Sequence, residues 1–202
     1  AAHTSMLVEP PLALTEPRSL VAAEVDVWLA PYAAFDASEL EALAYILSNE
    51  ERARRRRFHF ERDRLLFLVT RLLVRTCLSY YAPIAPAAWQ FEKNEHGRPF
   101  IANDGQRGLY FNLSNTHGLV ACAVARDRPG VGVDVERQDR RVEVLAIANR
   151  FFSSREVRDL HALPVTRHQR RFLSLWTLKE SYIKARSMGL ALPLGEFSFL
   201  LN

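Results

Sequence analysis

Ser48-Asn49-Glu50-Glu51 and Ser153-Ser154-Arg155-Glu156 are two copies of one pattern, 105 residues apart (153 minus 48). In both copies a serine precedes a glutamate by three residues, which is typical of the capping box that begins an α-helix. A longer helical pattern follows each copy, over 63–81 in the first case and around 176–184 in the second. The chain is therefore predicted to contain two similar halves.

Alternating or largely apolar segments predict the strands of these halves. They lie at 25–29, 89–92, 109–113, 119–125 and 131–136, and a further helix is predicted over 38–47. We expect an α+β fold in which the two halves are related by a pseudo-twofold. Each half is predicted to be a small, mostly antiparallel sheet packed on helices.

The predicted boundaries divide the chain into three parts. Residues 1–22 form a loose N-terminal lead-in, residues 23–118 the N-terminal α+β half, and residues 119–202 the C-terminal α+β half. The second half ends at Asn202 without counterparts for the strands that follow Trp89 in the first half. We therefore expect the C-terminal half to be truncated or to lack those strands.

Composition excludes several classes of protein. With 202 residues, 49% hydrophobic and 25% charged, the chain has enough apolar material for a core, so global disorder is excluded. Its apolar runs are much shorter than the ~20 residues of a membrane helix, and no basic-then-apolar segment opens it. We expect a cytoplasmic protein in which Cys77 and Cys122 are buried thiols.

The net charge of +4 favours acidic or phosphorylated partners. Nucleic acid, a membrane surface, a nucleotide cofactor and an acidic protein are all compatible with it. The basic run 54–57 is interpreted either as a solvated helix face or as a nucleic-acid contact. The chain contains no recognised nucleic-acid-binding motif, which disfavours the second interpretation.

Two carboxylates in Gly132-Val133-Asp134-Val135-Glu136 form the first candidate site. In an extended segment, Asp134 and Glu136 project from the same face. Two neighbouring carboxylates require a compensating cation, either Arg or Lys or a hard ion such as Mg²⁺. A solvated edge strand is the alternative interpretation.

A second candidate lies on the predicted helix around 176–184. Trp176, Glu180 and Lys184 are spaced four residues apart and therefore share one face, which also fits an ordinary surface ion pair. The third candidate comprises 97–100 and 111–118, where small hydroxyl and amide side chains at a strand end can donate to phosphate oxygens. Ordinary turns would explain these two segments equally well.

Taken in order, these segments resemble the 4'-phosphopantetheinyl transferase family, in its long, monomeric, surfactin-synthetase-activator type. The resemblance rests on 132–136, on Phe151-Phe152-Ser153-Ser154-Arg155-Glu156, on Trp176-Thr177-Leu178-Lys179-Glu180-Ser181-Tyr182-Ile183-Lys184 and on its extension 189–194. Weaker agreement covers 56–58, 97–99 and 111–114.

This resemblance implies an enzyme that transfers 4'-phosphopantetheine from coenzyme A to a serine of an apo acyl or peptidyl carrier protein and releases 3',5'-ADP. It also implies a Mg²⁺-dependent monomer that binds neither nucleic acid nor membrane. The active site is expected in the cleft between the halves.

Residue roles follow from the same resemblance. The acids matching the metal ligands are Asp134, Glu136 and Glu180. Glu180 and Lys184 are expected to be catalytic, with Lys184 contacting the phosphates. The positions expected to bind coenzyme A are Arg54, Arg98, Ser114, Asn115, Thr116 and Lys184.

Several alternatives stay open. The base that activates the serine is either Glu180 or a metal-bound water, and Glu156 has a sufficient structural role in its capping box. Asn115 stands where the family pattern has histidine, so a cationic partner for the 3'-phosphate is lost unless His117 or an arginine replaces it, and discrimination between coenzyme A and dephospho-coenzyme A is expected to be shallow. Ser187 replaces the first glycine of the family's turn. A catalytically impaired homologue that binds coenzyme A, or a basic nucleic-acid-binding module, is the alternative function.

Overall fold

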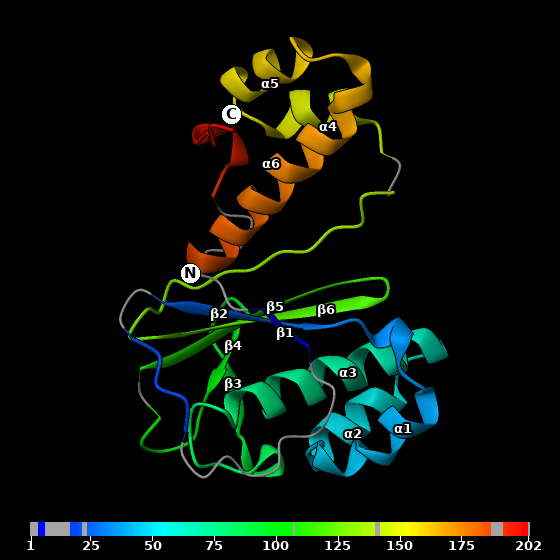
Figure 1. The fold of residues 1–202 in the computed structure, drawn as a ribbon, viewed down its shortest axis with the longest axis vertical. Coiled ribbons are helices and arrows are strands. Elements are labelled where there is room, and N and C mark those ends of the chain that lie inside the picture. Colours follow the sequence, from blue (N-terminus) through cyan, green and yellow to red (C-terminus); the bar gives the residue numbers. More distant parts are fainter. Residues whose placement is uncertain are drawn as a thin grey trace.

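The structure, a computed structural model, describes residues 4–6, 17–21, 24–106, 108–139, 142–186 and 192–201. Three helices form a layer on one side of a four-stranded sheet, and three further helices lie on the other side (Figure 1). An extended segment, 131–137, runs between the sheet and the second group of helices. The α+β class predicted from the sequence is confirmed.

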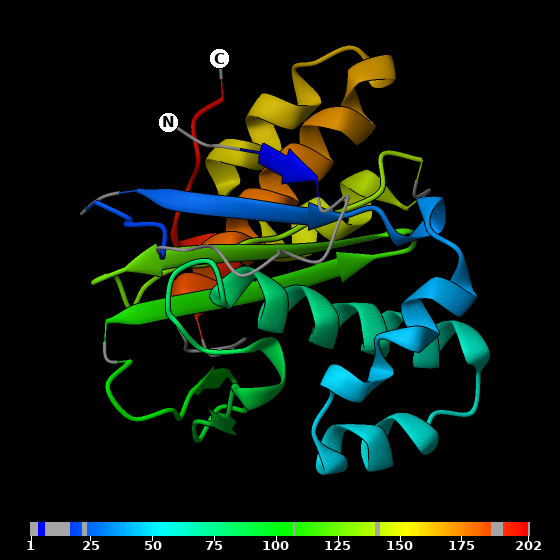
Figure 2. The ribbon, with the colours of Figure 1, turned by 60° about the horizontal axis from the view of Figure 1, so that its bottom comes forward.

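The central sheet has the strand order β1-β2-β6-β5. Its strands are β1 (Thr4–Met6), β2 (Val25–Ala30), β5 (Leu109–Thr116) and β6 (Leu119–Arg126). Strand β2 pairs antiparallel with β6, which pairs antiparallel with β5, while β1 runs parallel to β2 at one edge (Figure 2). Strands β3 (Phe91–Lys93) and β4 (Pro99–Ile101) form a separate antiparallel pair.

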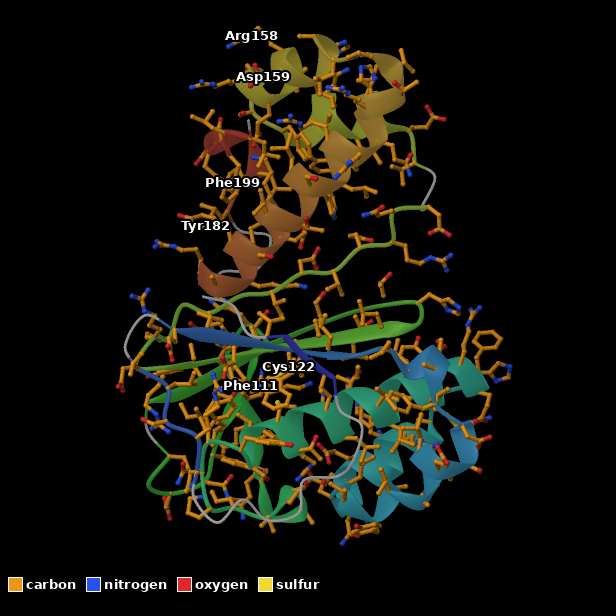
Figure 3. All side chains as sticks on the ribbon, viewed as in Figure 1. Phe111, Cys122, Arg158, Asp159, Tyr182 and Phe199 are labelled. Carbon is orange, nitrogen blue, oxygen red and sulfur yellow. The ribbon has the colours of Figure 1, made fainter. Side chains whose placement is uncertain are left out.

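The first helical layer contains α1 (Ala37–Ala42), α2 (Asn49–Arg56) and α3 (Glu61–Leu78). The side chain of Ser48 accepts from Glu51 N, and Glu51 in turn accepts from Ser48 N, so the predicted capping box is confirmed. Helix α3 packs its apolar face on the sheet, where Phe111 and Cys122 lie on the side facing α3 (Figure 3). Removing this apolar surface from water stabilises the first half.

The second helical layer contains α4 (Val144–Phe151), α5 (Ser154–His161) and α6 (Val165–Arg186). Its capping box, with Ser153 and Glu156, is also confirmed. The core of this layer is aromatic: Phe172 stacks on Phe152 at 5.2 Å and on Trp176 at 5.7 Å between ring centroids. The sequence thus repeats a short capped helix followed by a long one.

A buried ion pair joins the capping glutamate to the long helix in each half. In the first half, Glu51 Oε2 lies 2.8 Å from Arg75 Nη2, and Arg75 also donates to Pro86 O and Trp89 O. In the second half, Glu156 Oε2 lies 2.7 Å from the Lys179 ammonium, which donates to two backbone carbonyls further along the chain. Both halves therefore fix the segment after the long helix with the same device.

Three details differ from the sequence prediction. The segment 131–136 is extended but forms no ladder, and no strand is assigned among the described residues after Arg126. The helix predicted over 38–47 is interrupted at Leu43, after which a short 3-10 turn, Ala44–Ile46, follows α1. Within the predicted lead-in, Thr4–Met6 hydrogen-bond with β2 and so extend the sheet.

The missing ladder has a side-chain cause. Asn112 Oδ1 accepts from Val133 N at 3.0 Å, and Ser114 Oγ accepts from Val135 N at 3.3 Å. These two amides would otherwise bond to carbonyls of a neighbouring strand. The extended segment is therefore attached to β5 by side chains, and an alternating pattern alone cannot distinguish that arrangement from a strand.

Candidate active site

The extended segment approaches α6 closely because of Gly132. A Cβ on this residue would overlap Ser181 O and would lie 2.6 Å from Ala185 N. Alanines on the facing side of β6, Ala123 and Ala125, pack against Val131 and leave room for the segment on the sheet. Small residues on both sides therefore bring Asp134 between β5 and α6.

Lys184 forms the centre of a polar junction between the two halves. Its ammonium donates to Asp134 Oδ1 at 2.7 Å, to Ser114 Oγ at 3.0 Å and to Val133 O at 3.2 Å. Ser114 Oγ also donates to Asp134 Oδ1 at 2.9 Å. Three of the predicted site residues, from β5, the extended segment and α6, are thus in direct contact.

The second oxygen of Asp134 is a free acceptor. Asp134 Oδ2 is buried and has no hydrogen-bond partner within the described part of the chain, although burying an unpaired carboxylate oxygen is unfavourable. Its neighbour Oδ1 receives the bonds from Lys184 and Ser114. This oxygen is available to a cation or to a donor brought by a substrate.

Glu180 lies one helical turn before Lys184 on α6. Burial raises the pKa of Glu180, the Asp134 carboxylate raises it further, the Lys184 ammonium lowers it, and Glu136 raises it again. The carboxylates of Asp134 and Glu136, the other two predicted metal-binding acids, thus both contribute to the raised pKa of Glu180. Their mutual repulsion is reduced when a cation binds among them.

The donor set fits Mg²⁺, which is held by one or two carboxylates together with water and substrate phosphates. The unpartnered Asp134 Oδ2 and the destabilised charge of Glu180 both favour a cation. Among the residues that the structure describes, no group of three Asp, Glu, His or Cys side chains is arranged to hold a metal ion. The residues therefore suit a site that substrate phosphates would complete.

Lys179 and Glu156 are two buried residues that sequence reasoning did not place at the site. Lys179 has no exposed side-chain surface, and its ammonium donates to Leu194 O and Phe197 O, both at 2.7 Å, besides its pairing with Glu156. Lys179 directly precedes Glu180 on α6, so these contacts anchor the helix beside a predicted site residue. The sequence did contain a signal for this pair: Glu156 follows Glu51 by almost the same number of residues as Lys179 follows Arg75.

The residues expected to hold the nucleotide end of coenzyme A are less closely grouped. Ser114 belongs to the Lys184 junction, whereas Asn115 is exposed and Thr116 is half-buried at the end of β5. Arg54 is exposed on α2, on the other side of the sheet, with its guanidinium 5.7 Å from the centroid of the Phe67 ring.

Arg98 reaches the second half from the turn before β4. Its Nη1 donates to Lys184 O at 2.7 Å, and its Nη2 donates to Val131 O at 2.8 Å. The segment 189–194, which the family pattern includes, lies partly outside the described residues. Ser187 lies outside them.

Comparison with known families identifies the architecture. Residues 35–127 match the family "4'-phosphopantetheinyl transferase, N-terminal", and residues 130–202 match the 4'-phosphopantetheinyl transferase superfamily. HetI of Nostoc, named a 4'-phosphopantetheinyl transferase, is 35% identical over 174 residues, which cover 86% of this chain and 73% of HetI. The chain belongs to the 4'-phosphopantetheinyl transferase family.

Other family members show similar agreement. A 4'-phosphopantetheinyl transferase of Bacillus subtilis is 34% identical over 82% of this chain and 71% of its own length. The 4'-phosphopantetheinyl transferase Sfp of Bacillus subtilis strain 168 is 34% identical over 81% of this chain and 70% of its own. The predicted family is confirmed. Ser114 lies in the first matched segment, and Asp134 and Lys184 lie in the second, so the junction connects the two parts of the family pattern.

Proposed function

We propose that the junction of the two halves is where this transferase moves 4'-phosphopantetheine from coenzyme A to a serine hydroxyl of an apo carrier protein, releasing 3',5'-ADP. The observation that carries the proposal is the cluster of Lys184, Asp134 and Ser114, with an unpartnered carboxylate oxygen and Glu180 beside it. Phosphoryl transfer requires such a combination of cationic and carboxylate groups around the phosphates.

Asp134, Glu136 and Glu180 would hold Mg²⁺ in this site. When bound, the ion would neutralise charge on the pyrophosphate. Asp134 Oδ2 has no hydrogen-bond partner among the described residues, and burial, followed by the Asp134 and Glu136 carboxylates, raises the pKa of Glu180. Both observations support a cation-binding role for these side chains.

Lys184 and Glu180 carry the remaining chemistry. The Lys184 side chain is 29% exposed, so its ammonium is accessible to a phosphate oxygen while remaining anchored to Asp134. Glu180 takes the proton from the carrier serine during attack on the β-phosphorus. This assignment is supported by the position of Glu180 one helical turn before Lys184 on α6.

Coenzyme A binding is assigned to Ser114, Asn115, Thr116, Arg54 and Lys184. The hydroxyl of Ser114 already lies in the junction, and the end of β5 places Asn115 and Thr116 directly after it. Arg54 lines a depression together with Glu50, Ala53, Arg57 and Phe58, where its guanidinium and that of Arg57 could contact an anionic group.

A single copy of the chain supplies every residue of this site, which supports a monomeric enzyme. The thiols of Cys77 and Cys122 are both free, with 3.4 Å between their sulfur atoms, and this suits the reducing cytoplasm. No helix within the described ranges is long and apolar enough to cross a membrane. The acyl or peptidyl carrier protein is the proposed partner, in preference to nucleic acid or a membrane.

The test is incubation with coenzyme A, Mg²⁺ and an apo carrier protein, followed by mass spectrometry of the carrier. We expect the mass of one phosphopantetheine to be added. Asp134→Ala and Glu180→Ala should each abolish the addition while leaving the fold intact. Asp159→Ala is the matched control, since this exposed carboxylate lies on α5 at the far end of the second half (Figure 3).

Two outcomes would contradict the proposal. Near-normal transfer by either active-site variant at saturating Mg²⁺ would remove that residue from the site. Tight binding of coenzyme A by the unaltered protein without modification of any acyl or peptidyl carrier would identify a binding protein that does not catalyse transfer.

A further inference from the structure

The described hydrogen bonds of the Arg98 guanidinium join it to backbone carbonyls of both halves. Its Nη1 donates to Lys184 O at 2.7 Å and to Ala185 O at 3.5 Å. Its Nη2 donates to Val131 O at 2.8 Å and to Phe111 O at 3.5 Å. One guanidinium therefore connects the end of α6, the start of the extended segment and β5.

The position of these carbonyls explains why an arginine suits them. The last carbonyls of an α-helix have no intrahelical partner and carry the negative end of the helix dipole. Lys184 O and Ala185 O belong to the last turn of α6. A guanidinium has five donors in a fixed plane, so it can bond to α6 and to the extended segment at the same time. Burial lowers the pKa of Arg98, which is consistent with a cation whose solvation is replaced by carbonyl dipoles.

The same two segments carry the catalytic groups. Arg98 holds the backbone of Lys184, and the side chain of Lys184 bonds to Asp134. Arg98 also holds Val131 O, three residues before Asp134 in the chain. Gly132, which lies between Val131 and Asp134 in the chain, packs against α6. A displacement of either segment would separate the Lys184 ammonium from the Asp134 carboxylate.

We propose that Arg98 is a positioning residue that holds Lys184 and Asp134 at their working separation, and that it is not a ligand of coenzyme A. The proposal rests on the proposed transferase function of the junction. It replaces the assignment of Arg98 to the nucleotide end, which came from the family pattern alone. Small misplacements of catalytic groups lower the rate of the chemical step, whereas loss of a direct ligand contact weakens substrate binding.

The experiment compares Arg98→Ala and Arg98→Lys with the unaltered enzyme. Lysine keeps the charge, but its single ammonium cannot reproduce the planar fork that bridges Lys184 O and Val131 O. Arg126→Ala is the matched control, because Arg126, at the end of β6, donates to Tyr81 O and is one residue beyond the pairing of β2 with β6. Steady-state transfer gives kcat and the KM for coenzyme A, and hydrogen exchange by mass spectrometry reports the backbone.

We expect kcat to fall about tenfold or more in Arg98→Ala, with the KM for coenzyme A within about twofold of the unaltered value. Arg98→Lys should also lose kcat, despite keeping its charge. Peptides covering 131–134 and 183–186 should exchange faster in both Arg98 variants. Arg126→Ala should change none of these values.

Two results would overturn the positioning role. A large rise in the KM for coenzyme A with kcat retained, rescued by Arg98→Lys, would make Arg98 a direct ligand. Unchanged kinetics and unchanged exchange in Arg98→Ala would leave it without either role. If the unaltered protein transfers nothing, the proposed function fails, and the exchange data alone then decide whether Arg98 holds the two segments together.

Discussion

Replacing Lys179 by methionine tests the buried ion pair behind Glu180. Lys179 is fully buried and Glu156 is 1% exposed, so removing the ammonium leaves a carboxylate in the interior without its counter-charge. The carbonyls of Leu194 and Phe197 also lose their donor. Breaking a buried pair from one side costs about 3–5 kcal/mol of unfolding free energy. For a chain of this size, this corresponds to a fall of roughly 6–20 °C in the melting temperature.

Urea unfolding followed by tryptophan fluorescence measures this loss, with Trp176 stacked in the affected core. The double variant Glu156→Gln, Lys179→Met should be more stable than the sum of the single losses predicts, because neither charge is then left alone. Arg62→Met is the control: Arg62 is 75% exposed beside Asp63, and its replacement should change the unfolding free energy by no more than about 0.5 kcal/mol.

A loss below about 1 kcal/mol in Lys179→Met would refute the reasoning. Strict additivity of the two single variants would refute it as well, since it would mean that Lys179 and Glu156 do not act as a pair.

Three other changes have defined outcomes. Gly132→Ala should lower kcat/KM at least tenfold and destabilise the fold by about 1–3 kcal/mol, because the added Cβ meets the α6 backbone. Gly130→Ala is the control: its added Cβ would lie 3.5 Å from Ala185 O, so kcat/KM and stability should stay nearly unchanged. Glu180→Gln should raise the melting temperature at about pH 8 and leave it unchanged at about pH 4. A carboxyl group whose pKa is raised above 4.5 in the folded protein costs stability only once it ionises. An equal shift at both pH values would show that ionisation of Glu180 is not the cause. Asn115→His should increase the affinity for coenzyme A more than the affinity for dephospho-coenzyme A, with a larger gain at about pH 6 than at about pH 8. Isothermal titration measures both affinities, and equal gains for the two ligands would place Asn115 away from the 3'-phosphate.

The sequence predicted those features that depend on local patterns. Both capping boxes, the helix that carries Glu180 and Lys184, and most strands follow from spacing within a few residues. The family resemblance then indicated the residues of the junction, of which Asp134, Ser114 and Lys184 are in contact.

The remaining features depend on contacts between distant segments. The ladder expected over 131–136 is absent because Asn112 and Ser114 bond to its amides from across the chain. The carbonyls that Arg98 contacts lie 33 and 86 residues away, so no local pattern contains them. The burial of Lys179 could be inferred only by comparison with Arg75, and the burial of Arg75 itself depends on tertiary contacts.

Because side chains attach the extended segment to β5, a substitution can alter the active site without altering the backbone pairing of the sheet. Backbone ladders depend weakly on side-chain identity, whereas the bonds from Asn112 and Ser114 are lost with a single codon change. Such a change would move Asp134 relative to Lys184 and leave the pairing of β5 with β6 in place. Polar substitutions on this face of β5 would therefore disturb the active site while the central sheet keeps its backbone pairing.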